Sequence, residues 1–364
     1  MTSPALPFTT LHQVLTGATA GDAITTHAVD IQRWLHALGI RSHIYALHVD
    51  DSAAGFVRPL AAYRPRRQEP AVIYHHSIGS EVPDLLLGRP QRLVLVYHNV
   101  TPPDFFRHVD PGWVRLARLG QAQLAALQPK TALALAVSEY NRQDLLAAGY
   151  AHTAVLPLVL PAAAYDLPSD PALAAELAAA GPFLLFVGRF APNKKQADLV
   201  KLLACVRRIR PDVRLVLVGD PWIVGYDRFT RQLAADLGLA DAVALPGKVS
   251  PQALVTYYRH AALYVSLSAH EGFGKPLIES MYLGLPVLAY AAGGVAETLG
   301  PAGVRLHAKP FEELAELVAI LLADAALRQR LAAAGRQRVQ AFLEPAVHRQ
   351  FLAHLHTLAE RLAP

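Results

Sequence analysis

Short apolar runs alternate with amphipathic segments along this chain, and after one interruption the alternation begins again. Runs such as Leu93–His98 have the length of a buried strand, while residues 23–38 place Ile31 and Leu35 on one helical face and stop before Gly39. Strands that alternate with helices are typical of a parallel sheet covered by helices. The pattern therefore predicts an α/β fold with two Rossmann-like domains that face each other across a cleft.

The interruption is rich in proline and alanine, which suits a linker between domains. We expect a first domain over residues 1–160, a linker over 161–181, a second domain over 182–342 and a terminal segment over 343–364. The expected strands are His12–Leu15, His43–Leu47, Val72–His75, Leu93–His98, Leu133–Val137 and Ala154–Leu156 in the first domain, and Phe183–Val187, Arg214–Val218, Val243–Leu245, Leu263–Ser266, Pro286–Tyr290 and Gly303–Leu306 in the second.

Composition narrows the class of protein. Apolar residues form 53% of the chain and charged residues 17%, which excludes a disordered chain. No apolar run reaches the roughly 18 residues that a membrane span needs, and the first residues resemble no secretory signal. The single cysteine, Cys205, rules out an internal disulfide and a cysteine-based zinc site. These features predict a cytoplasmic protein.

The formal charge of +5 is distributed unevenly. Residues 1–180 contain 13 Lys and Arg against 14 Asp and Glu, whereas residues 181–364 contain 21 against 15. We therefore expect an anionic ligand in the second half. Nucleic acid is excluded as a partner, because the basic residues are scattered and no zinc-finger or RNA-recognition signature is present.

The segment Ser268–Met281 contains the strongest functional pattern. It follows an apolar run and enters an expected helix through a turn formed by Gly272, Phe273, Gly274 and Lys275. Backbone N–H groups in such a turn attract a phosphate or a hydroxyl. Glu271 and Glu279, eight residues apart, can hold hydroxyls of two parts of one ligand. The alternative is a tight turn flanked by surface glutamates.

A second pattern lies about 80 residues earlier, where Gly188, Arg189 and Lys194 follow an expected strand. A guanidinium fork and a compact ammonium just past the end of a strand can neutralise a diphosphate. The alternative is a pair of solvated loop side chains.

Together these patterns resemble the retaining GT-B glycosyltransferases of family GT4, the glycosyl transferases group 1. Glu271 and Glu279 match the family's E-x7-E signature, and Arg189 and Lys194 match its G-R-x4-K diphosphate motif. The resemblance implies a nucleotide-diphosphate sugar as donor and a terminal helix that packs back on the first domain. It also implies that Arg189 and Lys194 stabilise the leaving diphosphate, that Glu279 binds ribose, and that Glu271 and His98 hold the donor sugar.

The resemblance extends to further loops. The turn that binds the nucleotide base in the family corresponds to Gly247, Lys248 and Val249, and the loop that closes over the donor phosphates contains Gly21 and Asp22. Residues 293–297 resemble the family's G-G-x-x-E segment. An ordinary turn or loop is the alternative for each. Lys275 departs from the family, in which an apolar residue is common at this position. This lysine either favours an additional negative charge on a ligand or is simply solvated.

Polar residues end the expected strand Leu93–His98, at the rim where open α/β sheets bind ligands. His98 is the catalytic candidate, because the family often has a histidine here near the reacting sugar. His76, at the end of the preceding strand, and Asn99 are candidates for the acceptor side.

No D-x-D, H-E-x-x-H or C-x-x-C motif occurs, so no metal ligands are expected, and no cofactor fingerprint is present. We expect retaining, metal-independent sugar transfer from a UDP- or GDP-sugar to a glycan, lipid-linked or small-molecule acceptor, as in polysaccharide or glycolipid synthesis. Two alternatives stay open. One is an NDP-sugar epimerase or phosphorylase on the same fold, and the other is a protein that binds a nucleotide sugar without turning it over.

Residues 105–119 combine three aromatic residues with three arginines: Phe105, Phe106, Trp113, Arg107, Arg115 and Arg118. This mixture suits an anionic lipid surface, so we expect peripheral contact with the inner face of the plasma membrane. The alternative is a helix whose aromatic residues enter the core.

Overall fold

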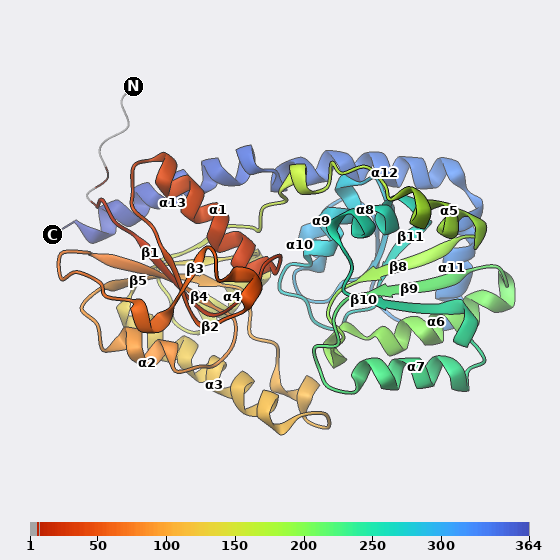
Figure 1. The fold of residues 1–364 in the computed structure, drawn as a ribbon, viewed down its shortest axis with the longest axis horizontal. Coiled ribbons are helices and arrows are strands. Elements are labelled where there is room, and N and C mark those ends of the chain that lie inside the picture. Colours follow the sequence, from red (N-terminus) through yellow and green to blue (C-terminus); the bar gives the residue numbers. More distant parts are fainter. Residues whose placement is uncertain (1–5, 7, 364) are drawn as a thin grey trace. The chain divides into compact units, whose positions relative to one another are not determined.

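The computed structural model describes residue 6 and residues 8–363. The chain divides into two compact units: the first comprises the chain up to Val159 together with the segment from Glu344 onward, and the second runs from Leu160 to Leu343. Each unit is a parallel sheet with helices packed on it (Figure 1). The α/β class and the two Rossmann-like units expected from the sequence are therefore confirmed.

The sheet of the first unit contains, within the described residues, seven strands in the order β3-β2-β1-β4-β5-β6-β7. These are β1 (His12–Ala18), β2 (Ile44–Val49), β3 (Val57–Pro59), β4 (Ala71–His76), β5 (Arg92–Tyr97), β6 (Thr131–Ala136) and β7 (Thr153–Val155). Its α-helices are α1 (Ala23–Ala37), α2 (Val82–Leu87), α3 (Pro111–Leu127), α4 (Glu139–Ala147) and α13 (Glu344–Leu362). The expected strands are present, and β3 is an addition, since three residues ending in proline show no alternation.

Strand β1 has β2 on one side and β4 on the other, so the strand order reverses at this point. In open α/β sheets, ligands bind beyond the carboxyl ends of the strands at such a switch point. The carboxyl end of β1 leads to Gly21 and Asp22, β4 ends with His75 and His76, and His98 follows β5. This arrangement places the candidate residues of the first unit at the ligand-binding edge of its sheet.

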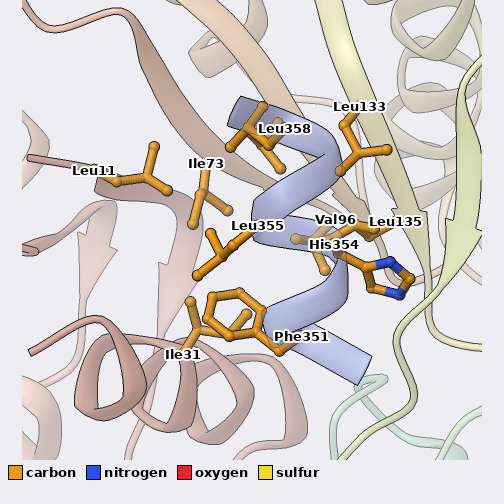
Figure 2. A pocket seen from close by; sticks show the side chains of 11 residues that line it. Leu11, Ile31, Ile73, Val96, Leu133, Leu135, Phe351, His354, Leu355 and Leu358 are labelled. Carbon is orange, nitrogen blue, oxygen red and sulfur yellow. The ribbon is translucent and has the colours of Figure 1, made fainter. Parts of the chain in front are cut away.

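Helix α13 completes the core of the first unit. Its buried residues Phe351, Leu355 and Leu358 face a small apolar pocket lined by strand residues such as Ile73 (Figure 2). At its start, Glu344 Oε1 accepts a hydrogen bond from Trp34 Nε1 at 3.0 Å. Burying a large apolar side chain stabilises a fold by about 1.5–3 kcal/mol, so this helix contributes strongly to the unit, and the expected packing on the first domain is confirmed.

The sheet of the second unit contains, among the residues described, six parallel strands in the order β10-β9-β8-β11-β12-β13. These are β8 (Phe183–Val187), β9 (Arg214–Val218), β10 (Val243–Gly247), β11 (Leu263–Ser266), β12 (Val287–Tyr290) and β13 (Val304–Leu306). Its α-helices are α5 (Pro171–Ala179), α6 (Gln196–Ile209), α7 (Tyr226–Asp236), α8 (Pro251–His260), α9 (Lys275–Tyr282), α10 (Val295–Leu299), α11 (Phe311–Ala323) and α12 (Ala325–Val339).

The central strands of this sheet are almost wholly apolar, as strands covered on both faces must be. Strand β8 lies between β9 and β11, so the switch point of this sheet is at β8 and β11. The loops that follow these two strands carry the two motifs found in the sequence. No helix in the described part of the chain is long and apolar enough to cross a membrane.

Candidate active site

The loop after β8 carries the two cations singled out in the sequence. Its first residue, Gly188, runs so close to the end of β9 that a Cβ atom on Gly219 would lie 2.0 Å from the Gly188 carbonyl oxygen. Arg189 is exposed, and its guanidinium carbon lies 5.1 Å from the centre of the Trp222 ring. The loop continues through a 3-10 turn, Pro192–Lys194, into α6. Sequence reasoning did not find the contact with Trp222.

The loop after β11 is joined to the first loop by backbone contacts. Ala269 N donates a hydrogen bond to the Asn193 carbonyl at 2.8 Å, and Asn193 Nδ2 donates to the His270 carbonyl at 3.3 Å. On the other side, a Cβ atom on Gly293 would lie 2.2 Å from the Glu271 carbonyl oxygen. Only glycine fits there, so the G-G segment after β12 holds the Glu271 backbone in place.

The two motifs meet in an ion pair. Lys194 Nζ lies 2.7 Å from Glu271 Oε2, and the side chains are 25% and 13% exposed. An ammonium group has three donors, so Lys194 can keep its bond to Glu271 and still donate to a phosphate oxygen. The pair therefore joins a cation for an anionic ligand to a carboxylate that can accept from a hydroxyl.

Glu279 occupies a buried position in α9. Its Oε1 atom accepts from the Tyr165 hydroxyl and its Oε2 atom from the Tyr258 hydroxyl, each at 2.5 Å, and Lys275 Nζ lies 3.8 Å from Oε1. Burial, followed by the nearby carboxylate, raises the pKa of both tyrosines well above the ordinary value. Each carboxylate oxygen has a further acceptor position, so Glu279 can still accept a hydrogen bond from a ribose hydroxyl. Ribose binding by Glu279 stays a prediction.

The turn between the two glutamates is shaped by Phe273 and Gly274. Phe273 is buried edge-on against Phe342, and its carbonyl accepts from Thr298 Oγ1 at 2.7 Å. Gly274 has a φ of +87°, a backbone conformation that favours glycine, and leads directly into α9. Gly272 lies half-buried at the start of the turn. The backbone groups of the turn are therefore held at the carboxyl end of β11.

The expected base-binding turn lies at the carboxyl end of β10. Gly247 has a φ of +76°, and its carbonyl accepts from Gly219 N at 3.0 Å. Lys248 is exposed and Val249 is half-buried. Contact of this turn with a nucleotide base stays a prediction.

In the first unit, Asp22 caps α1. Its Oδ1 atom accepts from Ile24 N at 2.8 Å and Thr25 N at 3.1 Å, and its Oδ2 atom accepts from Thr19 N at 3.2 Å. Gly21 precedes it with a φ of +85° and no heavy atom within 4 Å of a Cβ position. The carboxylate thus shapes the loop after β1, while contact of this loop with a donor phosphate stays a prediction.

Three histidines of the first unit converge at its switch point. His98 Nε2 and His75 Nδ1 are 3.0 Å apart, and His27 of α1 packs edge-on against the His98 ring, with 5.5 Å between ring centres. Burial lowers the pKa of His75 and His98 well below the ordinary value and that of His27 to about 4. All three rings are therefore neutral near pH 7, and His98 is the partly exposed one.

His76 and Asn99 lie deeper than the acceptor-side assignment suggests. His76 is fully buried, with Nε2 bonded to the Gly120 carbonyl at 2.8 Å. Asn99, at a φ of +79°, donates from Nδ2 to Asn141 Oδ1 at 3.0 Å and to Asp144 Oδ2 at 3.2 Å. Both side chains hold internal contacts, and their role toward an acceptor stays a prediction.

Residues 174–338, nearly the whole second unit, match the family model described as glycosyl transferases group 1. Over this region the chain is similar to the group 1 glycosyltransferases.

Curated relatives match this chain over part of their length. A D-inositol 3-phosphate glycosyltransferase of Stackebrandtia nassauensis is 34% identical over 156 residues, which are 41% of this chain and 35% of that protein. A GDP-mannose-dependent alpha-(1-6)-phosphatidylinositol monomannoside mannosyltransferase of Mycobacterium tuberculosis is 29% identical over 247 residues, 64% of this chain and 63% of the relative. The match therefore spans between 35% and 63% of these two relatives.

Solved structures match this chain over almost its whole length. HepE of Anabaena, in complex with UDP and glucose, has a TM-score of 0.73 and 19% identity, and the match covers 95% of this chain and 99% of HepE. A glycosyltransferase from Rickettsia africae has a TM-score of 0.74 and 16% identity, covering 97% and 99% of the two chains. At such identities the likeness shows the fold alone, and it confirms the GT-B fold.

Proposed function

We propose that the chain transfers a sugar, with retention of configuration, from a nucleotide-diphosphate sugar to a hydroxyl of a glycan or lipid-linked acceptor. The observation that carries the proposal is the Lys194–Glu271 ion pair at the carboxyl ends of β8 and β11. It combines a cation suited to a phosphate with a carboxylate suited to a sugar hydroxyl. The M. tuberculosis relative is named as GDP-mannose-dependent and as acting on a phosphatidylinositol monomannoside, which supports this donor and acceptor class.

Each group has a defined task in the proposed reaction. The bond from the anomeric carbon to the diphosphate oxygen breaks, a bond to the acceptor oxygen forms on the same face, and the acceptor proton passes to the leaving phosphate. Arg189 and Lys194 stabilise the negative charge that develops on the diphosphate. Loss of one such contact commonly costs about 2.7–4 kcal/mol of transition-state stabilisation. Glu271 is assigned to the donor sugar, Glu279 to the ribose, and His98 of the first unit to a sugar hydroxyl.

Two side-chain cations in the second unit support a reaction that needs no divalent metal. Arg189 is exposed beside Trp222, and Lys194 retains donors beyond its bond to Glu271. Arginine and lysine together can neutralise a diphosphate by a planar fork and a point charge. We therefore include metal independence in the proposal.

A donor panel tests the function. UDP-, GDP- and ADP-sugars are compared by thermal shift, and a donor present at 100 times its Kd should add about 2.7 kcal/mol of stability. The stabilising donor is then supplied with acceptors, and NMR determines the anomeric configuration of the product. Formation of an epimer without acceptor would favour the epimerase alternative. A donor that binds but never turns over would favour the non-catalytic alternative.

We also propose peripheral contact of α3 with an anionic membrane, on a smaller surface than the sequence indicates. Phe106 is fully buried and packs against the half-buried Trp113, with 6.0 Å between ring centres, so aromatic residues of this segment enter the core. Arg115, Arg118 and Leu119 are exposed, and their spacing places them on one helical face. This mixed basic and apolar face supports the proposal.

A further inference from the structure

A chain of hydrogen bonds leads from the interior of the first unit to His98. Gln13 Nε2 donates to the Ala28 carbonyl at 2.8 Å, Gln13 Oε1 lies 2.9 Å from His75 Nε2, and His75 Nδ1 lies 3.0 Å from His98 Nε2. Gln13 is 0% exposed and His75 is 1% exposed. This series of hydrogen bonds is therefore isolated from water along most of its length.

The protons along this chain are determined by elementary donor and acceptor rules. A carbonyl oxygen only accepts, so the Gln13 amide must turn its nitrogen toward Ala28 and its oxygen toward His75. His75 must then donate from Nε2, and because a neutral imidazole carries one N–H, its Nδ1 atom is an acceptor. His98 must therefore donate from Nε2 and carry a lone pair at Nδ1.

The surroundings keep the two rings in this relationship. The His75 and His98 rings are stacked, with 5.3 Å between centres and 23° between planes. His27 packs edge-on against both of them, at 6.1 Å from His75 and 5.5 Å from His98. A ring held on two sides has little freedom to rotate and exchange its nitrogens.

We propose that Gln13 and His75 are positioning residues that hold His98 in the tautomer with an acceptor at Nδ1, so that His98 recognises a ligand through a hydroxyl that donates to it. The inference rests on the proposed function, because a donor or acceptor sugar supplies the hydroxyl. It excludes His98 as the donor of a proton from Nδ1. A glutamine buried on β1 thereby determines which kind of group binds at the end of β5.

The test is NMR of the ligand-free protein with ring-labelled 15N histidine. Long-range 1H–15N correlation distinguishes a protonated from an unprotonated ring nitrogen, and His98→Gln assigns the His98 signals. We expect a single His98 tautomer, protonated at Nε2. A wild-type His98 protonated at Nδ1 would overturn the proposal, whether or not any variant folds.

Two variants on β1 separate positioning from general disturbance. Gln13→Met removes the acceptor for His75 Nε2 and should turn the His98 signals into those of a tautomer mixture. His12→Gln, on the neighbouring position of the same strand, should leave them unchanged. A folded Gln13→Met protein with the wild-type His98 signals would contradict the role of Gln13.

The rate of sugar transfer distinguishes this hydrogen-bonding role from a purely structural one. An asparagine at position 98 carries its side-chain oxygen near the Nδ1 position, whereas a glutamine reaches the Nε2 position. His98→Asn should therefore retain at least about tenfold more transfer than His98→Gln, equivalent to about 1.4 kcal/mol. The reverse order would overturn the proposal. Failure of the wild type to transfer with any donor would instead overturn the proposed function, and the tautomer measurement would still stand.

The three histidines also permit a direct check against metal binding. One ring nitrogen from each histidine lies within 4.8 Å of the other two. A metal ion there would take the His75 Nδ1 lone pair that His98 uses. Zinc titration of the wild type should leave the His98 signals in place, and stoichiometric zinc binding that shifts all three histidines would overturn the proposal.

Discussion

Lys194 and Glu271 are 77 residues apart in the chain, and their charged atoms are 2.7 Å apart in the structure. The contact exists because β8 and β11 are neighbours in the sheet, which places their carboxyl-end loops side by side. The ion pair is partly buried, so its charges are weakly screened and remain available to a ligand that excludes water. The contact therefore brings the cation motif and the carboxylate motif together in one place.

Removing the cations should reduce sugar transfer strongly. Lys194→Met and Arg189→Ala should each lower kcat/KM by about 10²–10³, because each loses a contact to the developing diphosphate charge. Steady-state kinetics with the identified donor measure this, and circular dichroism verifies the fold. Lys201→Ala, on the exposed face of α6, is the matched control. Near-wild-type rates for both variants would rule out the diphosphate assignment.

The two glutamates should differ in what they hold. Glu279→Ala should weaken binding of the nucleoside diphosphate alone, whereas Glu271→Ala should mainly reduce transfer. Calorimetric titration with the diphosphate separates the two effects. Glu279→Ala also leaves the Tyr165 and Tyr258 hydroxyls without their acceptor, at about 1–3 kcal/mol for each buried group. Tyr258→Phe therefore serves as a control for packing. Equal losses of diphosphate affinity in both glutamate variants would contradict the separate roles of Glu271 and Glu279.

Chelation should leave the activity intact. We expect the transfer rate in EDTA to equal the rate without it, because in the proposed reaction Arg189 and Lys194 neutralise the leaving diphosphate. The measurement is the initial rate before and after dialysis against EDTA, with manganese and magnesium added back. Activity that disappears on chelation and returns with either metal would contradict metal independence.

Replacing His27 should make the protein less sensitive to acid. Both ring nitrogens of His27 are buried without a hydrogen-bond partner among the described residues, and burial lowers its pKa from 6.5 to about 4. Between these values the unfolded state binds a proton that the folded state excludes, so the stability present above pH 6.5 falls as the pH approaches 4. When the pH is lowered from 7.5 to 4.5, the free energy of unfolding of His27→Phe should rise by on the order of 2–3 kcal/mol relative to that of the wild type.

Denaturant unfolding at the two pH values measures this difference. His260→Phe, at an exposed position, controls for the substitution itself. A His27→Phe protein whose stability falls with acid as steeply as that of the wild type would show that His27 is protonated in the folded state.

Membrane contact should depend on salt. Sedimentation with anionic liposomes should carry down the protein at low ionic strength and release it at high ionic strength, since each arginine near the surface contributes about 1 kcal/mol. Arg115→Ser with Arg118→Ser should reduce sedimentation, while Arg208→Ser, exposed on α6, should not. Wild-type protein that stays in the supernatant at low salt would exclude the contact.

Local patterns predicted much of the fold because strands such as β8 are continuous apolar runs and helices such as α1 have one apolar face. Strand β3 escaped prediction, because three residues at a sheet edge are held by pairing with β2 rather than by their own pattern. Phe106 shows the same limit in a helix-rich segment. Its residue type suits a lipid surface and a core equally, and packing against Trp113 decided for the core.

The sequence by itself determined the two Rossmann-like units and the loops that carry Arg189, Lys194, Glu271 and Glu279, since strand, turn and helix signals are local and the motif residues stand at fixed spacings from them. The tertiary structure alone decided which side chains share a contact. Tyr165 reaches Glu279 across 114 residues, and Gln13 reaches His75 across 62. Gln13 and His75 lie on the neighbouring strands β1 and β4, whereas Tyr165 follows a 3-10 turn and Glu279 lies in α9. Only tertiary packing brings these partners within hydrogen-bond distance, so no local pattern could have named them.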